Sequence, residues 1–218
     1  KPLNEGLLVE EKLGNESKLT PESKGAIHVF FAERATRKVT DIPADTEPRA
    51  IAKAGIVGAG TMGGGIAICF ANAGIPVTVL DTSDEALKRG LGVLEGTYDS
   101  MVKRGRLSPE DKAKRMGLIK GTTNYADLSE ADVIIEAVFE NMELKKKIFA
   151  ELDKVAKPGC VLATNTSTLD VEKIGAATKR PQDVIGLHFF SPANVMPLLE
   201  IVRTPQSSAE TIRTSVEL

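Results

Sequence analysis

A glycine-rich turn is the strongest sign of chemistry in this sequence. Residues 58–63 read Gly-Ala-Gly-Thr-Met-Gly, which is the pattern Gly-x-Gly-x-x-Gly. Where such a turn follows a strand and opens a helix, it binds the pyrophosphate of a dinucleotide. Gly58 allows the tight turn, Gly60 lets the phosphates approach the backbone, and Gly63 lets helix and strand pack closely. The N–H groups at the start of the helix then bind the phosphate.

An aspartate follows this turn at the spacing that ribose recognition requires. Asp81 comes 21 residues after Gly60, where a second strand is expected to end. A carboxylate there accepts hydrogen bonds from the ribose hydroxyls and repels a 2′-phosphate, so it favours NAD over NADP. The alternative is a glycine-rich packing turn in which Asp81 only caps a helix. The glycine pattern, its expected place between a strand and a helix, and Asp81 together favour the dinucleotide site.

The second half of the chain holds a candidate acid–base pair. His188 lies in an apolar run expected to be a late strand, and Glu200 lies in another apolar run after a turn with two prolines. A buried glutamate is costly unless it is paired, and a hairpin-like return would bring it beside His188. An imidazole oriented by a carboxylate can accept the proton of an alcohol. The alternative for His188 is a hydrogen-bonded core residue.

The elements that position these residues begin with a stretch that carries no charge. Residues 54–80 contain no Asp, Glu, Lys or Arg and seven glycines. A charge-free run this long is a candidate membrane span by length. Its glycines and its changing periodicity instead predict a strand, a glycine turn, a helix and a second strand, buried on both faces.

From residue 53 onward, strands and helices alternate, which predicts an α/β fold: a Rossmann-type, doubly wound, mostly parallel sheet. In the predicted helix over 143–156, we expect Leu144, Ile148 and Leu152 to face inward. Strands are expected at 54–57, 75–80, 118–122, 132–138, 161–165, 184–190 and 198–202, and helices at 62–73, 84–103, 143–156, 170–176 and from 208.

Residues 1–50 differ from the rest and predict a helical connector followed by a linker, ahead of a nucleotide-binding domain over 51–218. A helix that starts at Thr20-Pro21 carries Ile27, Phe30, Phe31 and Ala35 on one stripe, which needs a packing partner. The chain begins Lys-Pro with no apolar leader, and we expect it to be a segment of something longer.

The composition limits the classes of partner and the compartment that can be expected. A formal net charge of −2 gives no electrostatic reason to expect nucleic acid or an anionic membrane. The two cysteines, Cys69 and Cys160, lack metal-ligand spacing and predict free buried thiols in a reducing, intracellular compartment. We expect no metal site.

Four motifs in order resemble the L-3-hydroxyacyl-CoA dehydrogenases of fatty-acid β-oxidation, over about residues 53–218. They are residues 58–67, 136–141, 165–169 and 186–192. Residues 1–50 resemble the connector between the hydratase and dehydrogenase parts of multifunctional β-oxidation enzymes. The resemblance implies an acyl-CoA substrate, NAD as cofactor, the other domains of a multifunctional enzyme as partners, and a bacterial cytoplasm, peroxisome or mitochondrion as compartment.

The resemblance also implies roles for individual residues. His188 would be the general base, Glu200 its partner, and Ser167 a hydrogen-bond donor to the substrate's 3-oxygen. Lys145 could instead belong to a solvated helix face, and Ser167 could be a turn residue only. The cofactor-binding positions would be Gly58, Gly60, Thr61, Met62, Gly63, Asp81, Ala137, Val138, Phe139, Glu140, Lys145, Asn165 and Ser191.

Two departures from the family limit these expectations. Ser191 stands where stand-alone members carry Asn. The family's second, helical domain, which closes over the acyl-CoA, is absent from the sequence. We therefore expect the chain to bind NAD with little or no turnover by itself. The alternatives are a dehydrogenase of non-CoA hydroxy acids and a nucleotide-binding module without catalysis.

Overall fold

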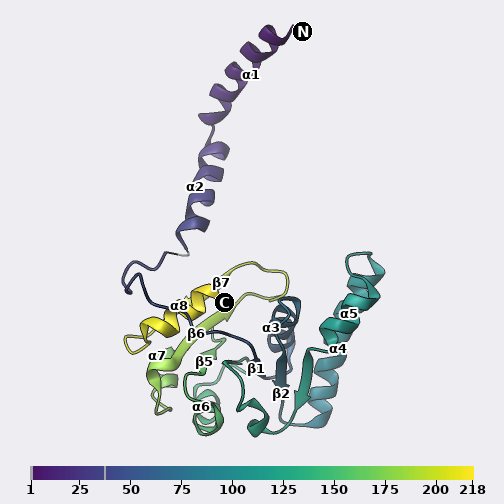
Figure 1. Cartoon of the computed structure of the whole chain (residues 1–218), viewed down its shortest axis with the longest axis vertical. Coiled ribbons are helices and arrows are strands. Elements are labelled where there is room, and N and C mark those ends of the chain that lie inside the picture. The colour runs from purple at the N-terminus through teal and green to yellow at the C-terminus, as the bar shows by residue number, and fades with distance from the viewer. Residues whose placement is uncertain (1, 37) are drawn as a thin grey trace. The chain divides into compact units, whose positions relative to one another are not determined.

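One twisted sheet organises the chain from Asp45 onward (Figure 1). Its strands are β1 (Ala54–Val57), β2 (Val77–Leu80), β3 (Ile119–Thr122), β4 (Val133–Glu136), β5 (Val161–Thr164), β6 (Val184–Phe189) and β7 (Leu199–Val202). The computed structural model describes residues 2–36 and 38–218, and within them these seven strands pair in the order β3-β2-β1-β4-β5-β6-β7. Each neighbouring pair is parallel except β6 and β7.

The strand order reverses between β1 and β4, which makes the crevice at their carboxyl ends the expected ligand site. Helices cover both faces of the sheet. Helices α3 and α4 pack on each other and lie on one face of the sheet. Helices α6 and α7 also pack on each other and lie on the opposite face. The helix bounds are α3 (Thr61–Asn72), α4 (Asp84–Lys103), α5 (Pro109–Met116), α6 (Met142–Val155), α7 (Val171–Gly175) and α8 (Ala209–Glu217), with short 3₁₀ helices η1 (Tyr125–Leu128) and η2 (Pro181–Asp183).

The core follows from the alternation of side chains along the central strand. Ile56 of β1 points toward α3, where a Cβ on Gly63 would lie only 3.1 Å from the Ile56 side chain. Val57 points the opposite way and joins a buried cluster that includes Phe149 and Leu152 of α6. Because both faces of β1 are covered, its residues are all buried. This explains the charge-free stretch and confirms the predicted strand, turn, helix and strand.

The predicted α/β fold, with a doubly wound and mostly parallel sheet, is confirmed. Two strand boundaries differ from expectation by two residues: β2 begins at Val77 rather than at residue 75, and β4 ends at Glu136 rather than at residue 138. The chain leaves the sheet there because Glu136 turns its carboxylate back to the N–H of Val138.

The expected inward face of α6 is wrong at one position. Ile148 and Leu152 are buried, but Leu144 is 37% exposed, and the next residue, Lys145, is buried instead. A lysine can occupy this interior position because an acidic partner, Glu136, compensates its charge.

The residues up to Ala44 form a separate compact unit. It contains α1 (Leu3–Lys18) and α2 (Pro21–Ala35), and Thr20 caps α2 through a hydrogen bond from the Ser23 N–H. Phe30 and Phe31 are exposed, so the apolar stripe expected on α2 has no packing partner within the described part of this unit. Of the helices in the described ranges, none combines the length and hydropathy needed to cross a membrane.

Residues after Ala44 belong to the unit that contains the sheet. Arg49 anchors this entry segment, since its guanidinium lies 2.7 Å from Asp183 Oδ1 and 3.2 Å from Glu210 Oε2. The division of function into a connector (1–50) and a nucleotide-binding domain (51–218) stays a prediction.

Candidate active site

A cavity of about 760 Å³ opens at the carboxyl ends of β1, β2 and β4. This is the crevice that the reversal of strand order predicts. Leu144, Pro192 and Asn194 complete its wall on the side of α6 and the β6–β7 loop. The cavity wall includes eight of the residues expected to bind cofactor: Gly58, Gly60, Thr61, Met62, Asp81, Ala137, Val138 and Phe139.

The glycine turn has the geometry that a phosphate site requires. Gly58 has φ +104°, and a Cβ at this position would lie 2.9 Å from the carbonyl oxygen of Ala137. A Cβ on Gly63 would collide with the carbonyl of Gly58. Around Gly60, by contrast, a Cβ would meet no atom within 4 Å, so this position is open to the cavity. The N-terminus of α3 therefore presents N–H groups to a space that can hold a pyrophosphate.

Asp81 follows β2 directly and lies in the cavity wall. Its Oδ2 accepts a hydrogen bond from the Ala59 N–H and its Oδ1 one from the Thr82 N–H, each at 2.7 Å. These bonds hold the carboxylate beside the glycine turn, where a ribose would lie. The alternative that Asp81 caps the next helix is wrong, because Ser83 caps α4 through a bond from the Ala86 N–H.

Glu140 organises the turn after β5. Its Oε1 accepts hydrogen bonds from Thr166 Oγ1 at 2.5 Å and from the Ser167 and Thr168 N–H groups at 3.1 and 3.2 Å. Burial tends to raise the pKa of this carboxyl, but these hydrogen bonds and the charge of Lys145 outweigh it, so the pKa is lowered. Ser167 Oγ lies 3.4 Å from the same oxygen. Glu140 thus holds Ser167 at the carboxyl end of β5.

Lys145 is neither on a solvated helix face nor in the cavity wall. It is fully buried, with its Nζ 2.6 Å from Glu136 Oε1 and 3.6 Å from Glu140 Oε2. The alternative of a solvated lysine is therefore wrong. The ammonium lies behind the Ala137–Glu140 turn and contacts that turn through Glu140.

His188 and Glu200 face each other across the antiparallel pair of β6 and β7. His188 Nδ1 lies 2.8 Å from Glu200 Oε2, which leaves Nε2 for a substrate. The predicted hairpin-like return is confirmed. The expected burial of Glu200 is wrong: its side chain is 52% exposed, because β7 is the edge strand, while that of His188 is 19% exposed.

Asn165 and Ser191 lie at the ends of the neighbouring strands rather than in the cavity wall. Asn165 Oδ1 accepts the Phe189 N–H at 2.8 Å and so fixes the end of β6 against that of β5. Ser191 is exposed and begins the loop whose Pro192 and Asn194 do reach the cavity.

Gly90 and Glu136 are two of the site residues that were not predicted. Gly90 of α4 lines the cavity, and a Cβ there would lie 2.6 Å from that of Ala59 and collide with the Ala59 carbonyl. Glu136 is buried at the end of β4. The sequence holds a signal for each of them. Glycine inside a helix lowers helix stability, and an acid at the end of a buried apolar strand costs free energy unless it has a partner.

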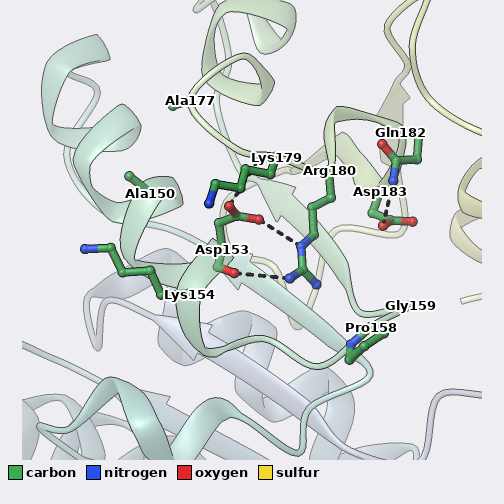
Figure 2. A pocket seen from close by; sticks show the side chains of 10 residues that line it. All are labelled: Ala150, Asp153, Lys154, Pro158, Gly159, Ala177, Lys179, Arg180, Gln182 and Asp183. Carbon is green, nitrogen blue, oxygen red and sulfur yellow. Dashed lines mark hydrogen bonds and ion pairs between the residues drawn. The ribbon is translucent and has the colours of Figure 1, made fainter.

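A second cavity, of about 670 Å³, lies at the amino ends of β5 and β6, away from the predicted residues. Figure 2 shows Arg180 and Asp153 joined by hydrogen bonds among the residues that line this cavity. Arg180 Nε donates to Asp153 Oδ1 at 2.9 Å, and the guanidinium also reaches the carbonyls of Lys157 and Asp153. These bonds tie α6 to the segment before β6, which is a structural role.

Neither cysteine forms a disulfide. Cys160 is buried, and burial raises the pKa of its thiol to about 12. Cys69, expected to be buried, is partly exposed, and its Sγ donates to the Ala193 carbonyl of the β6–β7 loop at 3.4 Å. Across the described ranges, no three His, Cys, Asp or Glu side chains gather in a way that could hold a metal ion.

The sheet order, the glycine turn and the cavity beside Asp81 define a Rossmann-type domain of the dehydrogenase class. The chain belongs to the 3-hydroxyacyl-CoA dehydrogenase, NAD binding domain family, whose model matches residues 53–218.

Similar proteins come from plants and bacteria. The peroxisomal fatty acid beta-oxidation multifunctional protein AIM1 of Arabidopsis thaliana is 42% identical over 95% of this chain and 29% of its own length. The fatty acid oxidation complex subunit alpha of Shewanella amazonensis is 39% identical over 99% of this chain and 31% of its own. The crystal structure of (S)-3-hydroxybutyryl-CoA dehydrogenase PaaH1 from Ralstonia eutropha is 41% identical, with a TM-score of 0.74 over 77% of this chain and 59% of that one. The chain thus spans less than a third of the length of the Arabidopsis and Shewanella relatives.

Proposed function

We propose that the chain is the NAD-binding part of an enzyme that oxidises L-3-hydroxyacyl-CoA to 3-ketoacyl-CoA in fatty-acid β-oxidation. The observation that carries the proposal is the His188–Glu200 pair. His188 lies at the carboxyl end of β6, and the cavity with the glycine turn and Asp81 lies at the carboxyl ends of the parallel strands β1, β2 and β4. A base for an alcohol and a site for a hydride acceptor are the two requirements of this reaction.

The cofactor-binding residues follow from the cavity. The glycine turn would receive the pyrophosphate and Asp81 the adenine ribose, so the nicotinamide half would extend past the strand reversal toward Val138 and Phe139. Asp81 supports NAD over NADP because its charge repels a 2′-phosphate. Thr61, Met62, Gly63, Ala137, Glu140, Lys145, Asn165 and Ser191 would contact the cofactor or shape its site.

In the reaction, the bound nicotinamide supplies the hydride acceptor. His188 Nε2 takes the proton of the 3-hydroxyl group as the carbonyl forms. Glu200 holds the imidazole through Nδ1 and stabilises the imidazolium that results. Ser167 donates a hydrogen bond to the 3-oxygen and so orients the carbon that gives up its hydride.

We propose further that the chain works within a larger multifunctional protein, as the lengths of its relatives support. Its relatives' names point to a peroxisome or a bacterial cell, and a mitochondrion remains an alternative by the family resemblance. By itself the chain would bind NAD with little turnover, because hydride transfer needs a cleft closed to water and the relatives are more than three times as long as the segment matched here.

Calorimetry with the 218-residue chain tests the cofactor site: NAD⁺ should bind at least about tenfold more tightly than NADP⁺. In the full-length enzyme that carries the chain, 3-hydroxybutyryl-CoA should be oxidised with formation of NADH, and free hydroxy acids should not. No binding of either dinucleotide would contradict the proposal. Oxidation of free acids would favour a non-CoA substrate, and binding without any oxidation would favour a module without catalysis.

A further inference from the structure

A buried ion pair joins the end of β4 to the first turn of α6. Lys145 Nζ lies 2.6 Å from Glu136 Oε1, and neither side chain is accessible to solvent. The same carboxylate accepts the Val138 N–H at 2.8 Å and Thr164 Oγ1 at 2.7 Å. Two buried charges add little net stability compared with an apolar pair of similar volume. A positional role therefore explains Glu136 better than stabilisation of the fold.

The ion pair contacts both the turn in the cavity wall and, through Glu140, the turn that carries Ser167. Through the Val138 N–H, Glu136 fixes the turn that forms one wall of the dinucleotide cavity. Through Lys145, it reaches Glu140, whose Oε2 lies 3.6 Å from the ammonium. Glu140 in turn accepts the N–H groups of Ser167 and Thr168. A continuous chain of polar contacts thus runs from the cavity wall to Ser167.

We propose that Glu136 is a positioning residue that holds the cofactor turn and the Ser167 turn in register with each other. The inference rests on the proposed function, since it concerns the same site. With Gln at position 136, the Val138 N–H keeps an acceptor but Lys145 loses its charged partner. Among the described contacts of the Lys145 ammonium, Glu140 is then the one acidic partner left. The attraction between these two charges draws the Glu140 carboxylate away from the turn that carries Ser167.

The test compares Glu136→Gln with Asp153→Asn, a matched control at the other end of α6 that weakens the Arg180 ion pair. NADH binding is measured on the 218-residue chain, and kcat/KM for 3-hydroxybutyryl-CoA on the full-length enzyme. Glu136→Gln should raise the NADH Kd about tenfold and lower kcat/KM about 10²-fold. Asp153→Asn should lower the melting temperature and leave both values within about twofold of the wild type.

A second variant keeps the proposal testable if Glu136→Gln folds poorly. In Glu136→Gln/Lys145→Met no uncompensated charge is buried, so the melting temperature should return toward that of the wild type. The losses in NADH binding and kcat/KM should remain, because the double variant also lacks the Lys145 ammonium that links the Glu136 side to Glu140 and the Ser167 turn. If NADH binding and kcat/KM recover in the double variant together with the melting temperature, the positioning role is overturned. It is also overturned if Glu136→Gln lowers the melting temperature but leaves NADH binding and kcat/KM unchanged. Failure of the wild-type chain to bind NADH would instead contradict the proposed function.

Discussion

His188 and Glu200 are direct partners across the one antiparallel strand pair of the described sheet, with Nδ1 and Oε2 2.8 Å apart. The register sets this contact, because a shift of one residue would place the two side chains on opposite faces. The pair lies at the end of β6, where Asn165 fixes the Phe189 N–H. The contact between His188 and Glu200 thus depends on the position of an edge strand.

Glu200→Gln should lower kcat of the full-length enzyme by about 10² to 10³-fold. The amide can still contact Nδ1, but it does not stabilise the imidazolium by charge. NADH binding should stay within about twofold, because Glu200 lies outside the cavity wall. Steady-state kinetics measures the effect, with Glu151→Gln, a change in an exposed surface pair, as control. A kcat equal to that of the wild type would show that Glu200 does not assist His188.

Asp81→Asn should weaken NAD⁺ binding about tenfold and reduce the discrimination against NADP⁺. The amide oxygen can still accept the Ala59 N–H, but the amide NH₂ cannot accept the Thr82 N–H, so one hydrogen bond is lost together with the charge. Calorimetry with both dinucleotides measures the ratio of the two Kd values. The exposed Asp84, in the first turn of α4, provides the control Asp84→Asn. An unchanged ratio would exclude a role of the Asp81 charge in selectivity.

Gly90→Ala should weaken NADH binding and lower the melting temperature, because the new Cβ would collide with the backbone of Ala59 in the glycine turn. The collision forces α4 away from the cavity wall. In the same helix, a Cβ on Gly96 meets no atom within 4 Å. Gly96→Ala should therefore stabilise the chain by about 0.5–1 kcal/mol. Equal effects of the two substitutions would show that the close approach of α4 is not required.

Glu140 should make stability depend on pH in the acid range. Its pKa in the folded chain is lowered from the ordinary value of 4.5. The stabilisation is therefore complete above about pH 4.5 and is lost as the pH falls through the folded-state pKa. The difference in unfolding free energy between wild type and Glu140→Gln should shrink as the pH falls from 7 to 3, measured by urea unfolding at each pH. A difference that is constant with pH would contradict this assignment.

The sequence was informative where a local rule decides the structure. Glycines at fixed spacing, apolar strands and the switch in periodicity over residues 54–80 led to the correct sheet, and two apolar runs around a turn led to the His188–Glu200 contact. These features depend on near neighbours in the chain, or on strand pairing that a short connection permits.

Contacts between distant segments could not be predicted in the same way. Periodicity placed Leu144 inward, but a partner from β4 made Lys145 the buried residue of that turn. The need for glycine at position 90 comes from its approach to Ala59, 31 residues earlier in the chain. The exposure of Glu200 follows from the edge position of β7, which depends on the order of the whole sheet.

In the proposed function, His188 is the base of an NAD-dependent dehydrogenase. The most direct test is the rate of NADH formation from L-3-hydroxybutyryl-CoA by full-length wild-type enzyme and by His188→Gln, with NADH binding measured on both. We predict that kcat falls by about 10² to 10⁴-fold while the NADH Kd stays within about twofold. A variant that forms NADH at the wild-type rate would show that His188 is not the base.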